Sequence, residues 1–245
     1  MSPSSLCRRP RGDPRGGRHR AGWLAAAAGL LAALAVAGSA DAATTARDSV
    51  VAQANGRAVF VYRKPGAKRP FRTFANPNPH GARLVFLVKE RRKGWEQVYL
   101  PSRPNGSIGW IRDDQISLAS NPYRVVVSLG GHSLTLYKGG RVVHREQAGV
   151  GRSVTATPTG TYYVVELLQQ ASPSGVYGPY AFGLSAFSNA LYSFGGGPGQ
   201  IGLHGTNEPG RLGTDVSHGC IRISNAGITR LARLLPLGTP VQITS

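Results

Sequence analysis

Short runs of alternating apolar and polar residues, separated by glycine and proline, dominate the pattern along this chain. Alternation with a period of two, in stretches rich in Val, Ile, Tyr, Phe and Trp, predicts β-strands. In the first half the clearest runs cover residues 57–62, 84–88, 95–100 and 108–111. Several such strands within about 65 residues, each closed by turn residues, predict a small barrel.

The second half continues the strand pattern and closes with one helix and a last strand. Runs at 123–129, 133–137 and 142–147 predict an antiparallel meander, and a further strand is predicted at 161–166. Ser224 is a favourable N-cap for a helix whose apolar residues recur at helical spacing, namely Ile228, Leu231, Leu234 and Leu235. Residues 239–244 then predict a closing strand. The predicted fold class is therefore mainly β, with a boundary at residues 120–122.

A neutral segment separates the meander from the C-terminal part. Residues 167–203 hold no Asp, Glu, Lys or Arg, but eight glycines and six aromatic residues. We expect 182–191 to pass mostly through the core, and 172–180 and 193–200 to form loops around a cleft. A mobile flap over a peptide groove is the alternative.

The first 42 residues have the composition of a secretory signal peptide. Six arginines lie within residues 1–20, an uncharged Ala- and Leu-rich run covers 21–38, and Ala40-Asp41-Ala42 suits a small-residue cleavage site. We expect export, followed by a flexible lead-in at residues 43–56. The alternative is an uncleaved segment that anchors the chain in a membrane, because the apolar run is at the lower limit for a span.

The charge balance is strongly basic. The 245 residues carry a net charge of +18, and removal of residues 1–42 leaves 23 basic and 9 acidic side chains, hence +14. Such a charge often indicates nucleic-acid binding. Because the leader indicates export, we expect no nucleic acid and favour anionic polymers of a cell envelope as a partner.

Cys220 is the candidate nucleophile, since it is the only cysteine after Cys7. A thiol with an ordinary pKa of about 8.5 is mostly protonated at neutral pH, so it needs a base. His204 and His218 are both available. His204 comes from a separate segment and can approach across the site, and the Gly205 carbonyl could fix its tautomer.

The neighbours of Cys220 supply further chemistry. Gly219 lets a substrate approach the backbone, and the N–H groups of Gly219 and Cys220 are candidate oxyanion donors. Arg222 could lower the thiol pKa or bind a substrate carboxylate. Among the aromatic residues we expect Tyr180 to contact the substrate.

Two other interpretations of these residues stay open. Cys220 could be a small buried apolar residue. Alternatively, thiolate, imidazole and carboxylate are zinc ligands, and Cys220, His204, His218 and Asp215 could form a zinc site. The spacing lacks the paired patterns of common zinc motifs, so we predict no metal.

Two segments together resemble the signature of the YkuD-type L,D-transpeptidase catalytic domain. They are His204-Gly205-Thr206 and Ser217-His218-Gly219-Cys220-Ile221-Arg222. Thr157-Pro158-Thr159-Gly160, Ile201-Gly202-Leu203 and Gly238-Thr239-Pro240-Val241 extend the resemblance over residues 122–245. It implies a β-rich domain with a short C-terminal helix and no cofactor. In it Cys220 is the acyl-accepting nucleophile, His204 the general base and acid, and Gly205 the orienting carbonyl; His218 and Gly219 assist, and Ser217 and Arg222 bind substrate.

The resemblance also implies a substrate. Cys220 would form a thioester with a peptidoglycan tetrapeptide stem, release D-alanine and make 3→3 cross-links. An L,D-carboxypeptidase or other peptidase on the same stems, or a non-catalytic wall-binding protein, is the alternative. Residues 57–119, with Gly94-Trp95 and Gly109-Trp110-Ile111, resemble a bacterial SH3-like module, which implies a role in positioning the enzyme on the wall.

Overall fold

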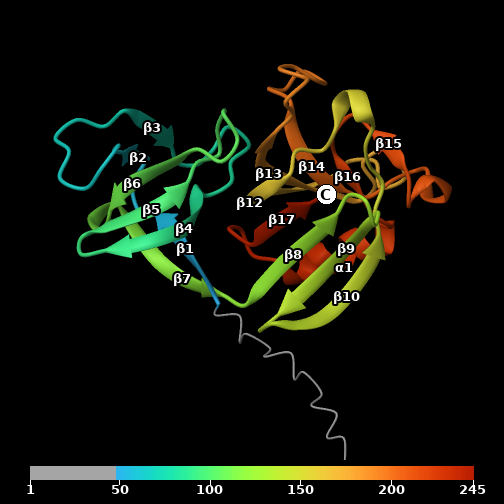
Figure 1. Ribbon diagram of the computed structural model, residues 1–245, viewed down its shortest axis with the longest axis horizontal. Coiled ribbons are helices and arrows are strands. Elements are labelled where there is room, and N and C mark those ends of the chain that lie inside the picture. The colour runs from blue at the N-terminus through green and yellow to red at the C-terminus, as the bar shows by residue number, and fades with distance from the viewer. Residues whose placement is uncertain (1–47) are drawn as a thin grey trace, which may run out of the picture. The chain divides into compact units, whose positions relative to one another are not determined.

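The computed structural model describes residues 48–245. The predicted signal peptide and the first part of the lead-in therefore lie outside the described residues. Within residues 48–245 the chain forms two main β-sheets and a single α-helix, so the mainly β prediction is confirmed for this part (Figure 1).

The N-terminal part is a five-stranded antiparallel sheet in the order β6-β5-β4-β1-β7, with a separate β2–β3 hairpin. The strands are β1 (Ser49–Ala54), β2 (Ala58–Val61), β3 (Arg72–Ala75), β4 (Val85–Arg92), β5 (Trp95–Tyr99), β6 (Ile108–Arg112) and β7 (Ile116–Asn121). A 3-10 turn at Asp113–Gln115 joins β6 to β7. All four apolar runs predicted in this region contribute a strand.

Strand β1 corrects the expected lead-in. Residues 49–54 were expected to be flexible, but they pair with β4 on one side and with β7 on the other. Neighbouring residues Val51 and Ala52 are both buried, on opposite faces of the strand. Ala52 and Ala54 face the core of this sheet, whereas Val51 joins Val85 and Tyr163 in a second cluster that includes the next domain. Small and β-branched residues on a central strand are buried on both faces, which composition alone does not reveal.

The C-terminal part is built on an eight-stranded mixed sheet in the order β10-β9-β8-β17-β12-β13-β14-β16. Its strands are β8 (Tyr123–Ser128), β9 (Ser133–Lys138), β10 (Arg141–Gln147), β12 (Gly160–Gln169), β13 (Tyr180–Phe187), β14 (Gln200–His204), β16 (Ile221–Arg222) and β17 (Pro240–Thr244). The last strand, β17, is central, because it runs parallel to β8 and antiparallel to β12. The short strands β11 (Val150–Gly151) and β15 (Asp215–Ser217) pair beside this sheet.

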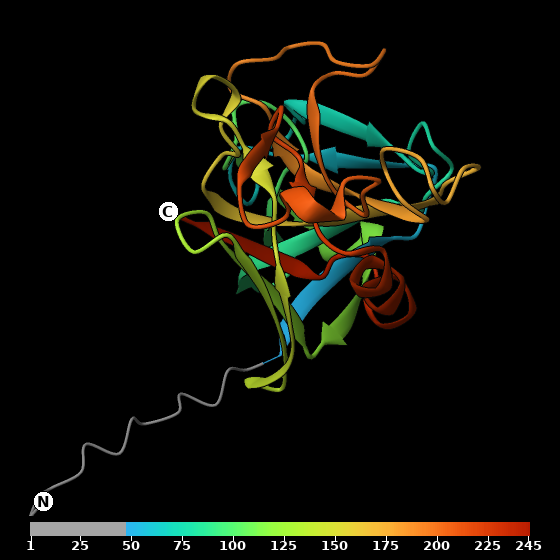
Figure 2. The same cartoon turned by 90° about the vertical axis from the view of Figure 1, so that its right-hand side faces the viewer.

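The predicted helix is confirmed as α1 (Asn225–Leu234). The Ser224 hydroxyl caps it by accepting the Gly227 N–H at 2.9 Å, and Ile228 and Leu231 are buried in the core of the C-terminal sheet. Contacts with β13 and β14 hold α1 against the strands that precede the candidate site (Figure 2). No helix within residues 48–245 has the length and apolar character needed to cross a membrane.

Candidate active site

Two neighbouring parallel strands bring the candidate nucleophile and base together. In the β14–β16 ladder Leu203 is opposite Ile221 and His204 is opposite Arg222. Cys220 immediately precedes β16, so this register places it beside Gly202. Because side chains two apart on a strand share a face, Gly202 and His204 face the same side. The Gly202 N–H donates to the Cys220 Sγ at 3.4 Å.

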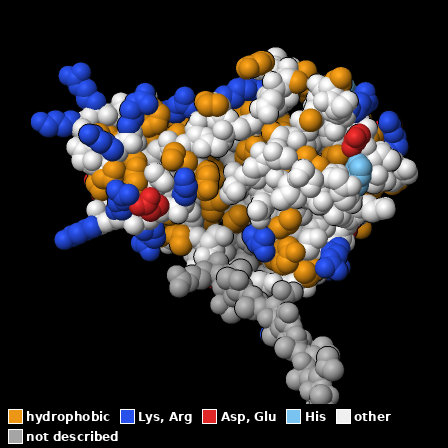
Figure 3. All heavy atoms as spheres, in the orientation of Figure 1, with side chains coloured by type: hydrophobic (Ala, Val, Ile, Leu, Met, Phe, Trp, Pro, Cys, Tyr) orange, Lys and Arg blue, Asp and Glu red, His pale blue; other side chains and the backbone are white. Residues whose placement is uncertain are grey.

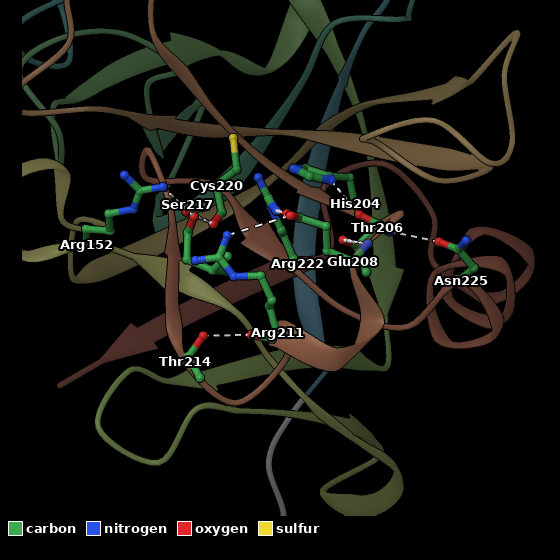
Figure 4. A network of polar contacts seen from close by, with 12 residues as sticks. Arg152, His204, Thr206, Glu208, Arg211, Thr214, Ser217, Cys220, Arg222 and Asn225 are labelled. Carbon is green, nitrogen blue, oxygen red and sulfur yellow. Dashed lines mark hydrogen bonds and ion pairs between the residues drawn. The ribbon is translucent and has the colours of Figure 1, made fainter.

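The missing side chain of Gly202 leaves the space between thiol and imidazole open. A Cβ at this position would lie 3.6 Å from the Cys220 Sγ and 3.6 Å from the His204 Cδ2. Figure 4 shows the sulfur and the imidazole on adjacent strands. The glycine between them is therefore part of the site's geometry.

His204 is buried and held in one orientation. Its Nδ1 lies 2.6 Å from the Gly205 carbonyl oxygen, and the Tyr177 ring packs edge-on against the imidazole at 4.9 Å between centroids. Burial, more than the nearby Arg222 charge, lowers the pKa of His204 from 6.5 to about 4, although the bond to Gly205 partly opposes this. At neutral pH the ring is thus uncharged. With its one proton donated to Gly205, Nε2 has a free lone pair.

The segment that follows His204 is packed too tightly for any side chain at position 205. A Cβ on Gly205 would come within 2.2 Å of the Asn225 Oδ1 and 3.0 Å of the Gly178 Cα. The same Asn225 oxygen accepts the Thr206 N–H at 2.8 Å. The first residue of α1 therefore fixes the backbone whose carbonyl orients His204.

Hydrogen bonds from two earlier segments shape the turn that presents Cys220. The Ser217 hydroxyl donates to the Cys220 carbonyl at 2.6 Å and accepts the Gly219 N–H at 3.0 Å. The Thr157 hydroxyl donates to the Gly219 carbonyl at 2.8 Å and accepts the Gly151 N–H at 2.9 Å. Gly219 has φ +120°, which disfavours a side chain there.

The thiol is protonated in the resting site. Burial raises the pKa of Cys220, and the Gly202 N–H and the Arg222 charge offset this only in part. The expected influence of Arg222 on the thiol pKa thus has the predicted direction but is outweighed. Arg222 is ion-paired through Nη1 with the Glu208 carboxylate at 2.9 Å, while its buried Nε has no partner within the described residues.

Several predicted roles need correction. The Gly219 N–H cannot be an oxyanion donor in this conformation because Ser217 accepts it, whereas the Cys220 N–H has no partner within residues 48–245. Ser217 is only 1% exposed and shapes the turn, so it is not placed to bind substrate. His218, expected to assist and not to be the base, is exposed and stacks on Phe194 at 5.3 Å.

The substrate contact expected of Tyr180 stays a prediction, and a second tyrosine, Tyr177, lies against the base. Tyr180 packs against the core of the C-terminal sheet, whereas Tyr177 contacts His204. Sequence reasoning also missed Asn225, for which no local signal exists, and a role for Thr157, although its Thr-Pro-Thr-Gly motif had been noted.

The zinc interpretation is not supported by the positions of its proposed ligands. Asp215 bonds to His132 at 2.8 Å, and His218 stacks on Phe194. Within residues 48–245 no three His, Cys, Asp or Glu side chains gather as a metal site would require.

Comparisons with known proteins agree with this geometry. The family model for the L,D-transpeptidase catalytic domain, YkuD, matches residues 122–243. The chain is 39% identical over 123 residues to the YkuD protein of Bacillus licheniformis, and 38% identical over 122 residues to that of Bacillus subtilis, both named as L,D-transpeptidases. Each alignment covers 50% of this chain and 66% of the relative.

Among solved structures, L,D-transpeptidase 3 from Mycobacterium tuberculosis matches with a TM-score of 0.44 at 17% identity, over 67% of this chain and 92% of that chain. This likeness is too distant to bear on function. The family model covers the domain that contains Cys220 and His204. Residues 122–243 are an L,D-transpeptidase catalytic domain of the YkuD type.

Proposed function

We propose that this protein is an L,D-transpeptidase of peptidoglycan, with Cys220 as nucleophile and His204 as general base and acid. The observation that carries the proposal is the placement of a thiol and a neutral imidazole on either side of Gly202. A cysteine beside an oriented imidazole is the arrangement used for covalent acyl transfer.

The first half-reaction uses the tautomer that Gly205 fixes. The Cys220 sulfur bonds to the carbonyl carbon of the L-residue that precedes D-alanine in a tetrapeptide stem. At the same time the thiol proton passes to the His204 Nε2. The carbon–nitrogen bond then breaks, and His204 gives that proton to the departing amine of D-alanine. The product is a thioester on Cys220. The Cys220 N–H is the donor available to the developing oxyanion.

The second half-reaction depends on the acceptor. If the side-chain amine of a neighbouring stem attacks the thioester, His204 takes its proton, the carbon–sulfur bond breaks, and the thiol is restored. The product is a 3→3 cross-link. Attack by water would instead release a tripeptide, which is the carboxypeptidase outcome. Arg222, whose side chain is 17% exposed and is paired with Glu208, is the cation proposed to hold a substrate carboxylate near this step.

We also propose that residues 57–119, with β1, act as an SH3-like module that positions the enzyme on the wall after export. Basic side chains support an anionic partner, because Figure 3 shows Lys and Arg gathered mainly on the side where Figure 1 places β2–β6. They include Arg91 and Arg92, whose side chains are 58% and 57% exposed. Export through residues 1–42 supplies access to the wall.

Mass spectrometry of the purified chain, incubated with a disaccharide tetrapeptide, tests the function. Cross-linked dimer with free D-alanine is the expected result, and the Cys220→Ala variant should give neither. Tripeptide alone would establish a carboxypeptidase. Absence of product and of an acyl adduct on Cys220, with the fold intact, would contradict an enzymatic role and favour wall binding.

A further inference from the structure

Arg103, in the N-terminal part of the chain, binds a loop of the catalytic domain. Arg103 lies in the connection between β5 and β6, and its guanidinium donates to three carbonyls of the loop formed by residues 188–199. These are Pro198 at 2.7 Å, Ser188 at 2.9 Å and Leu191 at 3.0 Å. One side chain thus binds both the beginning and the end of this loop.

Aromatic rings complete the binding of the guanidinium. It lies 4.9 Å from the centroid of Phe187 and 4.8 Å from that of Tyr192. The neighbouring Asn105 pairs with the Phe187 backbone in both directions, donating to its carbonyl at 2.7 Å and accepting its N–H at 2.9 Å. A guanidinium is planar and has several N–H groups, so it can stack on rings and donate to several carbonyls at once. The ammonium group of a lysine cannot do both.

The loop makes few hydrogen bonds of its own. It contains no charged residue and four glycines, of which Gly195, Gly196 and Gly199 have positive φ. Its own hydrogen bonds close two local turns, one through the Ser188 hydroxyl and one between Phe194 and Gly197, and the Ser188 N–H donates to the Gly199 carbonyl at 2.8 Å to join the ends of the loop. Arg103, together with Asn105, which donates to the Asn189 side chain at 3.1 Å, connects the loop to the N-terminal part.

The tip of the loop reaches the candidate site. Phe194, half exposed, stacks on His218 with 5.3 Å between ring centroids and 30° between planes. His218 lies two residues before Cys220. A series of contacts that begins at Arg103 therefore ends on the turn that carries Cys220, through the loop, Phe194 and His218.

We propose that Arg103 is a positioning residue: it holds the 188–199 loop so that Phe194 and His218 form one wall of the groove through which a stem peptide reaches Cys220. The N-terminal module then determines substrate affinity as well as location. The binding of a stem peptide along Phe194 and His218 rests on the proposed function. The positioning of the 188–199 loop by Arg103 does not.

Arg103→Ala is the test, with Arg124→Ala as matched control. Arg124, on β8, also stacks on an aromatic ring, that of Tyr137 at 4.4 Å, and its hydrogen bond goes to Gln242 and not to the loop. In the full chain, Arg103→Ala should speed amide hydrogen exchange within residues 188–199 at least tenfold. It should raise KM for the tetrapeptide about tenfold with kcat within twofold. The control should change neither.

A second variant separates positioning from general loss of structure. Phe194→Ala should reproduce the rise in KM, and the double variant should be no worse than either single variant, because both act through one wall. Unchanged hydrogen exchange in Arg103→Ala would show that Arg103 does not position the 188–199 loop. Faster exchange without a change in KM would overturn the role in substrate binding.

If the unaltered chain turns over no stem peptide, the proposed function fails. The positions of Phe194 and His218 are then tested by the rate at which a reagent modifies Cys220. N-phenylmaleimide should modify Cys220 several-fold faster in Arg103→Ala than in Arg124→Ala, with peptide mapping to separate Cys220 from Cys7. Equal rates would overturn the proposal.

Discussion

The Asn225 side-chain oxygen accepts the backbone N–H of Thr206 at 2.8 Å and so connects the first turn of α1 to the segment that carries His204. This single bond spans 19 residues of sequence. It fixes the peptide group that joins Gly205 to Thr206, whose carbonyl orients the imidazole of His204.

Asn225→Ala should reduce kcat about tenfold and destabilise the chain, because it leaves the Thr206 N–H without its acceptor. A buried donor left unpaired costs about 1–3 kcal/mol. Asn225→Asp retains an acceptor oxygen and should recover most of the activity. Urea unfolding and turnover measure both effects, and equal loss in the two variants would show that the oxygen is not what matters.

Gly202→Ala should fold normally and yet lose most of its activity. The added methyl meets its neighbours at ordinary contact distance, 3.6 Å, but it stands between the Cys220 sulfur and the imidazole. We expect a loss in kcat of at least 100-fold with a free energy of unfolding within about 1 kcal/mol of the unaltered chain. Full activity in a folded variant would mean that sulfur and imidazole do not meet over Gly202.

Gly205→Ala should behave in the opposite way and destabilise the fold. Its methyl would lie 2.2 Å from the Asn225 oxygen, and such overpacking costs about 1–3 kcal/mol. Gly210→Ala is the control, since a methyl there meets nothing within 4 Å. Chemical denaturation of the two variants measures the difference, and similar midpoints would contradict the packing described here.

Stability should fall as pH decreases from 6.5 towards 4. The pKa of His204 is about 4 in the folded chain against 6.5 unfolded, so the unfolded chain binds more protons in this window. The contribution is full above pH 6.5 and amounts to roughly 3 kcal/mol for a difference of about 2.5 pH units. His204→Gln removes the titration. Its unfolding free energy should therefore depend less on pH, whereas parallel profiles would contradict a neutral buried imidazole.

Ser217→Ala should disturb the turn that presents the thiol. It removes a donor to the Cys220 carbonyl and the acceptor of the Gly219 N–H, at an expected cost of about 1–3 kcal/mol. Thr214→Ala, which removes one exposed bond to the Arg211 carbonyl, should cost less than about 0.5 kcal/mol. Unfolding experiments and the rate of Cys220 alkylation compare them. If Ser217→Ala behaves like Thr214→Ala, the hydroxyl does not shape the turn.

The sequence was informative where chemistry is local. The Cys220 turn, the helix cap at Ser224 and most strands follow from residue type and spacing within a few positions. The resemblance of His204-Gly205-Thr206 to a family signature indicated the orienting carbonyl, which the structure shows at 2.6 Å.

What escaped prediction depends on contacts between distant segments. The use of the Gly219 N–H depends on the rotamer of Ser217, and the role of Asn225 depends on α1 packing beside β14. Arg103 was not singled out because its partners are backbone carbonyls, which leave no pattern in sequence. The strand at residues 49–54 was missed because its small residues resemble those of a linker.

The place of β1 has a consequence for the order in which this chain can fold. Ser49 pairs with Asn121 at the far end of the N-terminal sheet, and Val51 pairs with Leu87. Strand β1 therefore has no partner until β4 has been made, and its other edge stays unpaired until β7, the last strand of the sheet, is complete. Pairing over such separations is slow. During this delay the backbone groups of residues 49–54 are free to pair with other chains. A chaperone that binds this segment would prevent such pairing.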